Sequence, residues 1–314
     1  MSEENKAIVR RFYEEVMNHG RVDVLDEIMT PDFKDHGETL LGSPTGREVL
    51  KQGITGTRQI LEGLTVHLHQ IHAEGNLVGV RGRMSCVHRG TFFGVPGTGN
   101  ALSWAGLAMF RIQEGRIAER WFNSDSLSIV QQLGITTPLA QAAPVTGAPA
   151  RSSSEGSLPA PDAASRTRAS ASIEDVRRLA VALGDPDATV LSRTLDELLA
   201  PGFVLHGEAG SPRVMGRESL ERVLLSFKEA FTDVEVTLEA SVTEGNAVMA
   251  HLRLGCIQRR EWMGSPVTGK PLTWTLTLLA VRSGEGLSEG WMLQDRLGLF
   301  EQLGLMPHIP GQGG

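Results

Sequence analysis

Two aspartates end chain segments in which apolar and polar residues alternate, and their surroundings suggest acid/base chemistry. In the first segment, Trp121, Asn123 and Asp125 follow one another at two-residue steps, and Asp295 ends the other segment in the same way. Residues two apart on a strand share a face, so the carboxyl group would lie beside an indole ring. If that face lines a cavity, loss of hydration disfavours the ionised carboxylate, and the group could exchange a proton near neutral pH. The alternative interpretation is an aspartate that caps a helix beginning near Ser126.

Three histidines could also transfer protons or donate hydrogen bonds. His36 and His206 each follow a short predicted helix and precede Gly-Glu, where an imidazole could point into the mouth of a cavity. There it could donate to a developing enolate oxygen, although a histidine bonded to a backbone carbonyl is an equally good interpretation. His88 shares its strand parity with the apolar Met84 and Cys86, so we predict that it lines the pocket as well.

The elements that must position these residues follow from the apolar periodicity. Ile8, Phe12 and Val16 mark a first helix, a short second helix ends near Pro31, and a third helix follows Gly46. Helices followed by hairpin-linked strands indicate an α+β fold, an antiparallel sheet with helices packed on one face. If strongly curled, such a sheet makes a cone with a pocket inside. The predicted strands are 65–71, 77–88, 102–112 and 116–124.

This pattern occurs twice along the chain at a constant spacing, with His206 lying 170 residues after His36. A period of that length far exceeds a solenoid repeat, so each copy is a whole domain. The stretch between the copies is rich in Ala, Pro and Ser and has almost no large apolar residue, which is typical of a linker. The predicted organisation is a first domain at 1–135, a linker at 136–171, a second domain at 172–306 and a tail at 307–314.

Three features together resemble a known family. They are the His36 tract after a short helix, the turn from Gly94 to Gly99, and Trp121-x-x-x-Asp125 running into Gln-Leu-Gly. They resemble the SnoaL-like polyketide cyclases, also called ester cyclases, of the nuclear-transport-factor-like cone superfamily, over nearly the full length of both copies. The resemblance implies two cone-shaped domains and an enzyme of secondary metabolism, such as antibiotic biosynthesis, that needs no metal or organic cofactor. In the resembled cyclases the aspartate at the position of Asp125 removes a proton between two carbonyls, and the enolate closes the ring by aldol attack.

The expected reaction is therefore cofactor-independent ring closure on a polyketide-like carbonyl substrate. The second copy carries Gln258 where the first has His88, so it either repeats the chemistry or serves as a scaffold. The alternatives are an epoxide hydrolase or epoxide-opening cyclase of the same fold, and a non-catalytic small-molecule-binding module. The predicted catalytic residues are Asp125, His36, His88, Asn123, Asp295 and His206. The predicted substrate-binding residues are Trp104, Trp121, Phe33, Trp274, Trp291 and Phe203.

Composition narrows the class of partner. With 30 Lys and Arg against 37 Asp and Glu, the formal net charge of −7 argues against nucleic acid or an anionic membrane surface as a partner. No apolar stretch approaches the roughly 20 residues that span a bilayer. Cys86 and Cys256 are too few for a disulfide framework or a four-ligand zinc site. We expect a cytoplasmic protein that binds a small hydrophobic substrate. The resemblance further implies that its two domains pair as an internal pseudo-dimer, with a further homo-oligomer possible.

Overall fold

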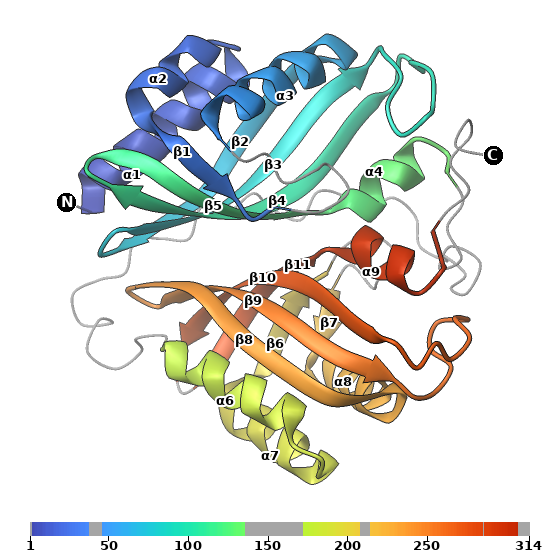
Figure 1. Cartoon of the computed structure of the whole chain (residues 1–314). Coiled ribbons are helices and arrows are strands. Elements are labelled where there is room, and N and C mark those ends of the chain that lie inside the picture. The colour runs from blue at the N-terminus through green and yellow to red at the C-terminus, as the bar shows by residue number, and fades with distance from the viewer. Residues whose placement is uncertain (1, 38–45, 136–171, 208–213, 285, 307–314) are drawn as a thin grey trace.

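The computed structural model describes residues 2–37, 46–135, 172–207, 214–284 and 286–306 of the chain. The predicted linker and tail lie outside the described residues. The described part forms two tandem α+β domains, one above the other in Figure 1. This confirms the predicted fold class.

The first domain begins with helices and continues as a run of long strands, as predicted. Its elements are α1 (Ser2–Arg11), the π-helix η1 (Phe12–Asn18), the 3-10 helix η2 (Val22–Val24), α2 (Leu25–Ile28), β1 (Met29–Asp35), α3 (Arg47–Ile60), β2 (Leu61–Glu74), β3 (Leu77–His88), β4 (Ala101–Gln113), β5 (Arg116–Ser124) and α4 (Ser126–Gln132).

The second domain repeats this order. Ser172 and Asp175 form a capping box at the start of its first helix, and Asp187 caps the next. Its elements are α6 (Ile173–Gly184), α7 (Ala188–Leu198), β6 (Leu199–His206), β7 (Val214–Gly216), α8 (Arg217–Ala230), β8 (Phe231–Glu244), β9 (Ala247–Gln258), β10 (Pro271–Ser283), β11 (Gly286–Gln294) and α9 (Arg296–Gln302).

The two sheets have the strand orders β1-β5-β4-β3-β2 and β7-β6-β11-β10-β9-β8. The predicted antiparallel hairpins are present, but β1 runs parallel to β5 and β6 runs parallel to β11. The strands predicted in the first domain pair antiparallel, and each sheet has in addition one parallel pair, which the sequence analysis did not predict. The edge strand β1 was missed because it is short and contains Pro31, and its register against β5 shifts between Met29 and Lys34.

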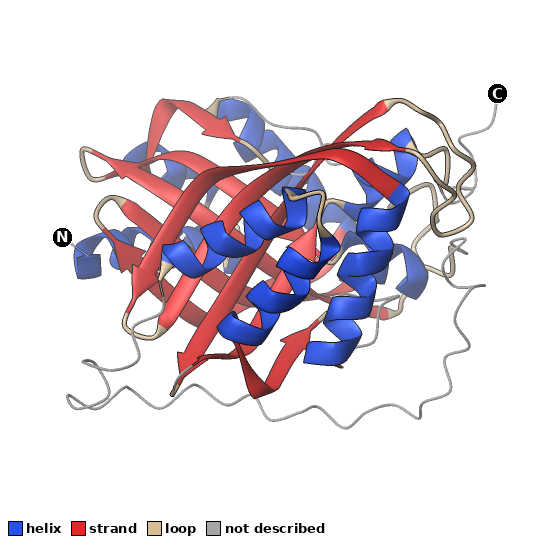
Figure 2. Ribbon diagram, turned by 90° about the horizontal axis from the view of Figure 1, so that it is seen from below, coloured by secondary structure: helices blue, strands red, loops and turns tan. Residues whose placement is uncertain are grey.

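Each sheet has two different faces. The inner face packs against the helices of its own domain, and the outer face is turned toward the other sheet (Figure 1). Figure 2 shows the helices of the second domain lying across the inner face of its sheet. In β4, Trp104 and Phe110 belong to the inner core, whereas Leu107 and Met109 belong to an apolar cluster shared with the second domain.

The contacts between the domains are reciprocal. The Glu74 carboxylate accepts a hydrogen bond from the Thr243 backbone N–H at 2.8 Å, and the Glu244 carboxylate accepts one from the Ala73 N–H at 3.2 Å. Residues 73 and 74 occupy the same repeat positions as 243 and 244, so each domain makes the same contact to the other. Such reciprocity is the mark of a two-fold interface. The tandem domains thus pair as an internal pseudo-dimer. None of the helices in the described ranges is long and apolar enough to cross a membrane.

Candidate active site

Trp121 and Asn123 share the outer face of the sheet, whereas Asp125 lies beyond the end of β5 and caps α4. Trp121 is buried in the interdomain cluster, and Asn123 is fully buried between the domains. Its amide donates to Thr275 Oγ1 at 3.0 Å and accepts from Thr277 Oγ1 at 2.7 Å. Strand parity correctly grouped Trp121 and Asn123, and the structure places their face against the second domain. Trp291 likewise packs against the interdomain cluster from the second domain.

Asp125 and Asp295 occupy the cap position that was the alternative interpretation. The Asp125 carboxylate accepts a hydrogen bond from the Ser128 N–H at 3.0 Å, and the Asp295 carboxylate accepts one from the Gly298 N–H at 2.8 Å. Each aspartate thereby satisfies a free backbone donor in the first turn of its helix. The acid/base role of the two carboxylates remains a prediction.

His36 and His206 lie on the outer faces of the sheets. Their rings stack on Trp121 and Trp291, with centroids 5.0 Å apart in both domains. His36 Nε2 is 2.9 Å from Glu119 and His206 Nε2 is 2.7 Å from the equivalent Glu289. Burial raises the pKa of Glu119, but the hydrogen bonds from His36 and Arg111 outweigh it and hold that pKa below its ordinary value. Both imidazoles thus lie beside the interdomain interface, each stacked on a tryptophan and paired with a glutamate. The sequence had led us to expect them at the mouth of a cavity.

His88 lies on the inner face of the first sheet, on the same side of β3 as Met84 and Cys86. It is fully buried. Its Nδ1 accepts a hydrogen bond from the Thr98 backbone N–H at 3.3 Å and lies 3.1 Å from Thr98 Oγ1. Since an amide can only donate, the neutral ring carries its proton on Nε2. That Nε2 is buried and has no partner among the described residues, so its N–H is a hydrogen-bond donor without an acceptor there.

In the second domain, the side chain at the equivalent position, Gln258, has hydrogen-bond partners for both its oxygen and its nitrogen. Gln258 Oε1 accepts from the Thr268 N–H at 3.2 Å, just as His88 accepts from Thr98. Gln258 Nε2 then donates to Ser265 Oγ at 3.2 Å and to the Ser265 carbonyl at 3.3 Å. The first domain has Val95 at the repeat position of Ser265 and offers no such side-chain acceptor. The unpaired donor, His88 Nε2, is therefore found in the interior of the first domain, and the equivalent group of the second domain is paired.

The interior of the first domain contains an ion pair that the sequence analysis did not predict. Arg120 Nε donates to Asp35 Oδ1 at 3.2 Å and Arg120 Nη2 donates to Asp35 Oδ2. Only 1% of the Asp35 side chain and 15% of the Arg120 side chain are exposed. The guanidinium lies 5.4 Å from the ring of Phe122, and the neighbouring Tyr13 is buried, which raises the pKa of its phenol far above the ordinary value.

The second domain has no counterpart to this ion pair. Leu205 and Gly290 stand at the repeat positions of Asp35 and Arg120, paired in the same register. A Cβ added to Gly290 would lie 3.2 Å from the Leu205 side chain, so leucine already fills this space. A comparison of the two copies could have revealed the pair, because the first domain has two charged residues at positions where the second domain has leucine and glycine.

The remaining predicted substrate contacts lie in the two cores. Trp104 and Phe33 are buried in the first domain, and Trp274 and Phe203 are buried in the second. Trp274 Nε1 is buried without a partner among the described residues. These side chains are on the inner side of their sheets, as expected for walls of an interior site. Their contact with a substrate stays a prediction.

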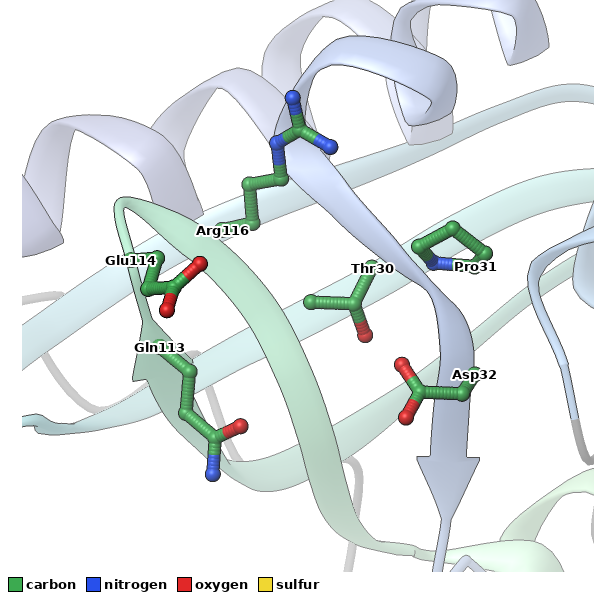
Figure 3. A pocket seen from close by; sticks show the side chains of 6 residues that line it. All are labelled: Thr30, Pro31, Asp32, Gln113, Glu114 and Arg116. Carbon is green, nitrogen blue, oxygen red and sulfur yellow. The ribbon is translucent and has the colours of Figure 1, made fainter.

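Neither of two hollows on the described surface contains a predicted catalytic residue. The first, of about 450 Å³, lies where β1 separates from the β4–β5 hairpin (Figure 3). The second, of about 390 Å³, lies beside α8. Among the residues with described positions, no group of three or more His, Cys, Asp or Glu side chains could hold a metal ion. The first hollow is lined by Thr30, Pro31, Asp32, Gln113, Glu114 and Arg116. The second is lined by Met215, Ser219, Arg222, Val223, Ser226, Trp262 and Met263.

Comparison with known proteins matches each domain separately. The family model described as SnoaL-like polyketide cyclase matches residues 7–133 and again residues 177–303. IdmH of Streptomyces antibioticus is 30% identical over 42% of this chain and 99% of its own, with a TM-score of 0.38. A SnoaL-like protein of Jannaschia sp. CCS1 is 24% identical over 42% of this chain and 92% of its own, with a TM-score of 0.40. AclR of Streptomyces galilaeus is 22% identical over 43% of this chain and 98% of its own, with a TM-score of 0.39. Comparison with curated proteins gave no match.

Proposed function

Since the chain belongs to the SnoaL-like polyketide cyclase family, we propose that it is a cofactor-independent enzyme that closes a ring on a polyketide-like carbonyl compound, and that its first domain carries the chemistry. The observation that supports this assignment is the buried, unpaired Nε2 of His88. A second supporting feature is that Gln258 is fully hydrogen-bonded at the equivalent position, which leaves the second domain the role of a paired scaffold.

His88 would act on the oxygen of a substrate carbonyl. The Thr98 N–H holds Nδ1 as an acceptor, so the Nε2 proton is oriented for donation before any substrate arrives. When the proton between two carbonyls leaves, negative charge develops on oxygen, and a donor in a water-poor site stabilises that charge strongly. Because His88 is fully buried, a substrate reaches Nε2 only when a neighbouring group moves; Phe92 is one neighbour, with its ring centroid 6.4 Å from that of His88.

A base must accept the proton that leaves carbon. Asp125 is the candidate implied by the family resemblance, with its carboxylate at the start of α4. Asp35 is a buried carboxylate inside the first domain, but Arg120 already engages both of its oxygens. Asn ranks with Asp as a helix cap, so Asp125→Asn removes the ionisable group and leaves the cap in place. Loss of turnover in Asp125→Asn with normal folding would assign the base to Asp125.

Deuterium exchange on benzoylacetone tests the proposal without knowledge of the natural ring. The protein should accelerate exchange of the proton between the two carbonyls, followed by NMR in deuterated buffer. His88→Gln installs the residue of the second domain and should lower the accelerated rate by about 100-fold, the usual effect of losing one oxyanion donor. Gln258→His is the matched control and should leave the rate unchanged. Wild-type exchange no faster than buffer, with benzoylacetone binding still detectable by calorimetry, would point to a binding module.

The Asp35–Arg120 pair favours one further reaction, the opening of an epoxide. In that reaction a carboxylate activates water while a cationic or acidic group stabilises the leaving oxygen. Asp35 and Arg120 bring these two groups together in the first interior, close to Tyr13. Hydrolysis of styrene oxide that is lost in Asp35→Asn but kept in His88→Gln would select this reaction over ring closure.

A further inference from the structure

The interdomain face is apolar around one buried chain of hydrogen bonds. His251 Nδ1 and Thr277 Oγ1 are 2.8 Å apart, and the Thr277 hydroxyl donates to Asn123 Oδ1 at 2.7 Å. Because that hydroxyl proton is committed to Asn123, His251 must be the donor to Thr277. Asn123 then donates through Nδ2 to Thr275 Oγ1 at 3.0 Å. Asn123, Thr277 and His251 are all fully buried, so each depends on the others for its hydrogen bonds.

The chain joins residues that differ between the two copies. The first domain supplies Asn123, and the second domain has Leu293 at that repeat position. The second domain supplies the two threonines and the histidine, where the first has Ala105, Leu107 and Arg81. If two first domains paired through the same faces, the Asn123 amide would meet alanine and leucine and would be left buried without partners. If two second domains paired, the Thr277 hydroxyl would lose its acceptor and Thr275 would lose its donor, because Asn123 supplies both and Leu293 stands at its repeat position.

A cation on the same face adds a second discrimination. The Arg81 guanidinium lies 4.4 Å from the ring centroid of Trp291 in the other domain, and its Nε donates to Gln70 at 2.8 Å. The equivalent Trp121 already has the Arg111 guanidinium 5.2 Å from its ring, whereas the second domain has Val281 at that repeat position. Pairing of two first domains would therefore bring Arg81 against a tryptophan whose face is occupied by another cation. Arg81 would then have to displace the Arg111 guanidinium, which is held there by Glu119 at 2.8 Å.

We infer that the hydrogen-bond chain of Asn123, Thr275, Thr277 and His251, with Arg81 against Trp291, makes the two sheet faces selective for each other, so that the first domain accepts the second domain and rejects another copy of itself. A buried polar group that is satisfied in only one pairing is an established way of encoding partner choice. The partner that this surface fits is the second domain of this chain. This inference stands on the interface alone and does not depend on the proposed reaction.

The test compares full-length chains in solution. Wild type should be a 33.9 kDa monomer by light scattering, and donor-labelled and acceptor-labelled chains should show no energy transfer after mixing. The variant Asn123→Leu/Thr275→Ala/Thr277→Leu/His251→Leu/Arg81→Leu removes every polar member of the chain and the Arg81 cation. It should remain folded but gain energy transfer between chains and a concentration-dependent mass. A wild-type protein that already exchanges partners, or a folded variant that stays monomeric without energy transfer, would overturn the inference.

A milder set of variants keeps the inference testable if the fivefold variant does not fold. Asn123→Leu and Thr277→Val each break the same hydrogen bond, so the shifts that they cause in the urea midpoint should be strongly non-additive when combined. Ser103→Ala, on an exposed part of the same sheet, is the matched control and should leave the midpoint and the absence of exchange unchanged. Additive shifts for Asn123→Leu and Thr277→Val would show that the two side chains are not coupled, which contradicts the inference.

Discussion

Replacing Arg120 by methionine should destabilise the first domain severely. Methionine keeps an apolar stem against Phe12 and Phe122 but removes the cation that faces Asp35. With 1% of its side chain exposed, Asp35 cannot regain hydration in the folded state, and it keeps the Gly37 N–H at 3.1 Å as a donor. Removal of one partner from a buried ion pair typically costs about 3–5 kcal/mol. We therefore expect the unfolding free energy of the first domain to fall by about that amount.

The double variant Asp35→Leu/Arg120→Met separates this cause from a packing defect. Leucine is the residue that the second domain carries at the Asp35 position, as Leu205, and the first domain already accommodates the long Arg120 stem opposite this position. Replacement of both members of a buried pair by apolar residues is often neutral or stabilising. The double variant should thus recover most of the stability that Arg120→Met loses.

Urea unfolding followed by tryptophan fluorescence and circular dichroism measures both variants, with each domain fitted as its own transition. The reasoning predicts a large loss in Arg120→Met and a small one in the double variant, with similar m-values throughout. A single variant within about 1 kcal/mol of wild type would show that Asp35 is not held as an uncompensated buried charge. A double variant as unstable as the single one would show that packing around Arg120, and not its charge, stabilises the domain.

Three further predictions follow from individual side chains. Burial, and then the charge of His36, lowers the pKa of His251 from 6.5 to about 3. Between these two values the unfolded chain binds a proton at His251 and the folded chain does not. The free energy of unfolding should therefore fall by up to about 2 kcal/mol between pH 6.5 and pH 5. His251→Leu should lose that part of the pH dependence in urea titrations, and an unchanged slope would contradict the assignment. Asp125→Ala should lower the free energy of unfolding by about 1 kcal/mol, whereas Asp125→Asn should leave it almost unchanged, as measured by thermal unfolding. Equal losses in the two variants would argue against a capping role for Asp125. Burial raises the pKa of Cys86 to about 11 and that of Cys256 to about 12, so iodoacetamide should label neither thiol at pH 8 until the protein unfolds, and rapid labelling of the folded protein would refute this.

Local patterns in the sequence were enough to predict most of the architecture. The alternation at residues 77–88 and 116–124 matches β3 and β5, because a strand presents its side chains to alternate faces whatever surrounds it. The constant spacing of the repeated motifs revealed two domains for the same reason, since equal sequences fold in equal ways. β1 escaped prediction because its pairing with β5 joins distant residues, and Pro31 and Asp32 hide its alternation.

The side of the sheet that each set of residues faces was decided only by the tertiary structure. Parity placed Trp121 and Asn123 together, but a strand buried on both faces carries no local sign of which face meets the helices and which meets another domain. The ion pair of Asp35 and Arg120 and the hydrogen bonds from Asn123 to Thr275 join residues far apart in the chain. Such contacts depend on strand register and domain pairing, which are set by the packing of the whole chain and not by any short stretch of it.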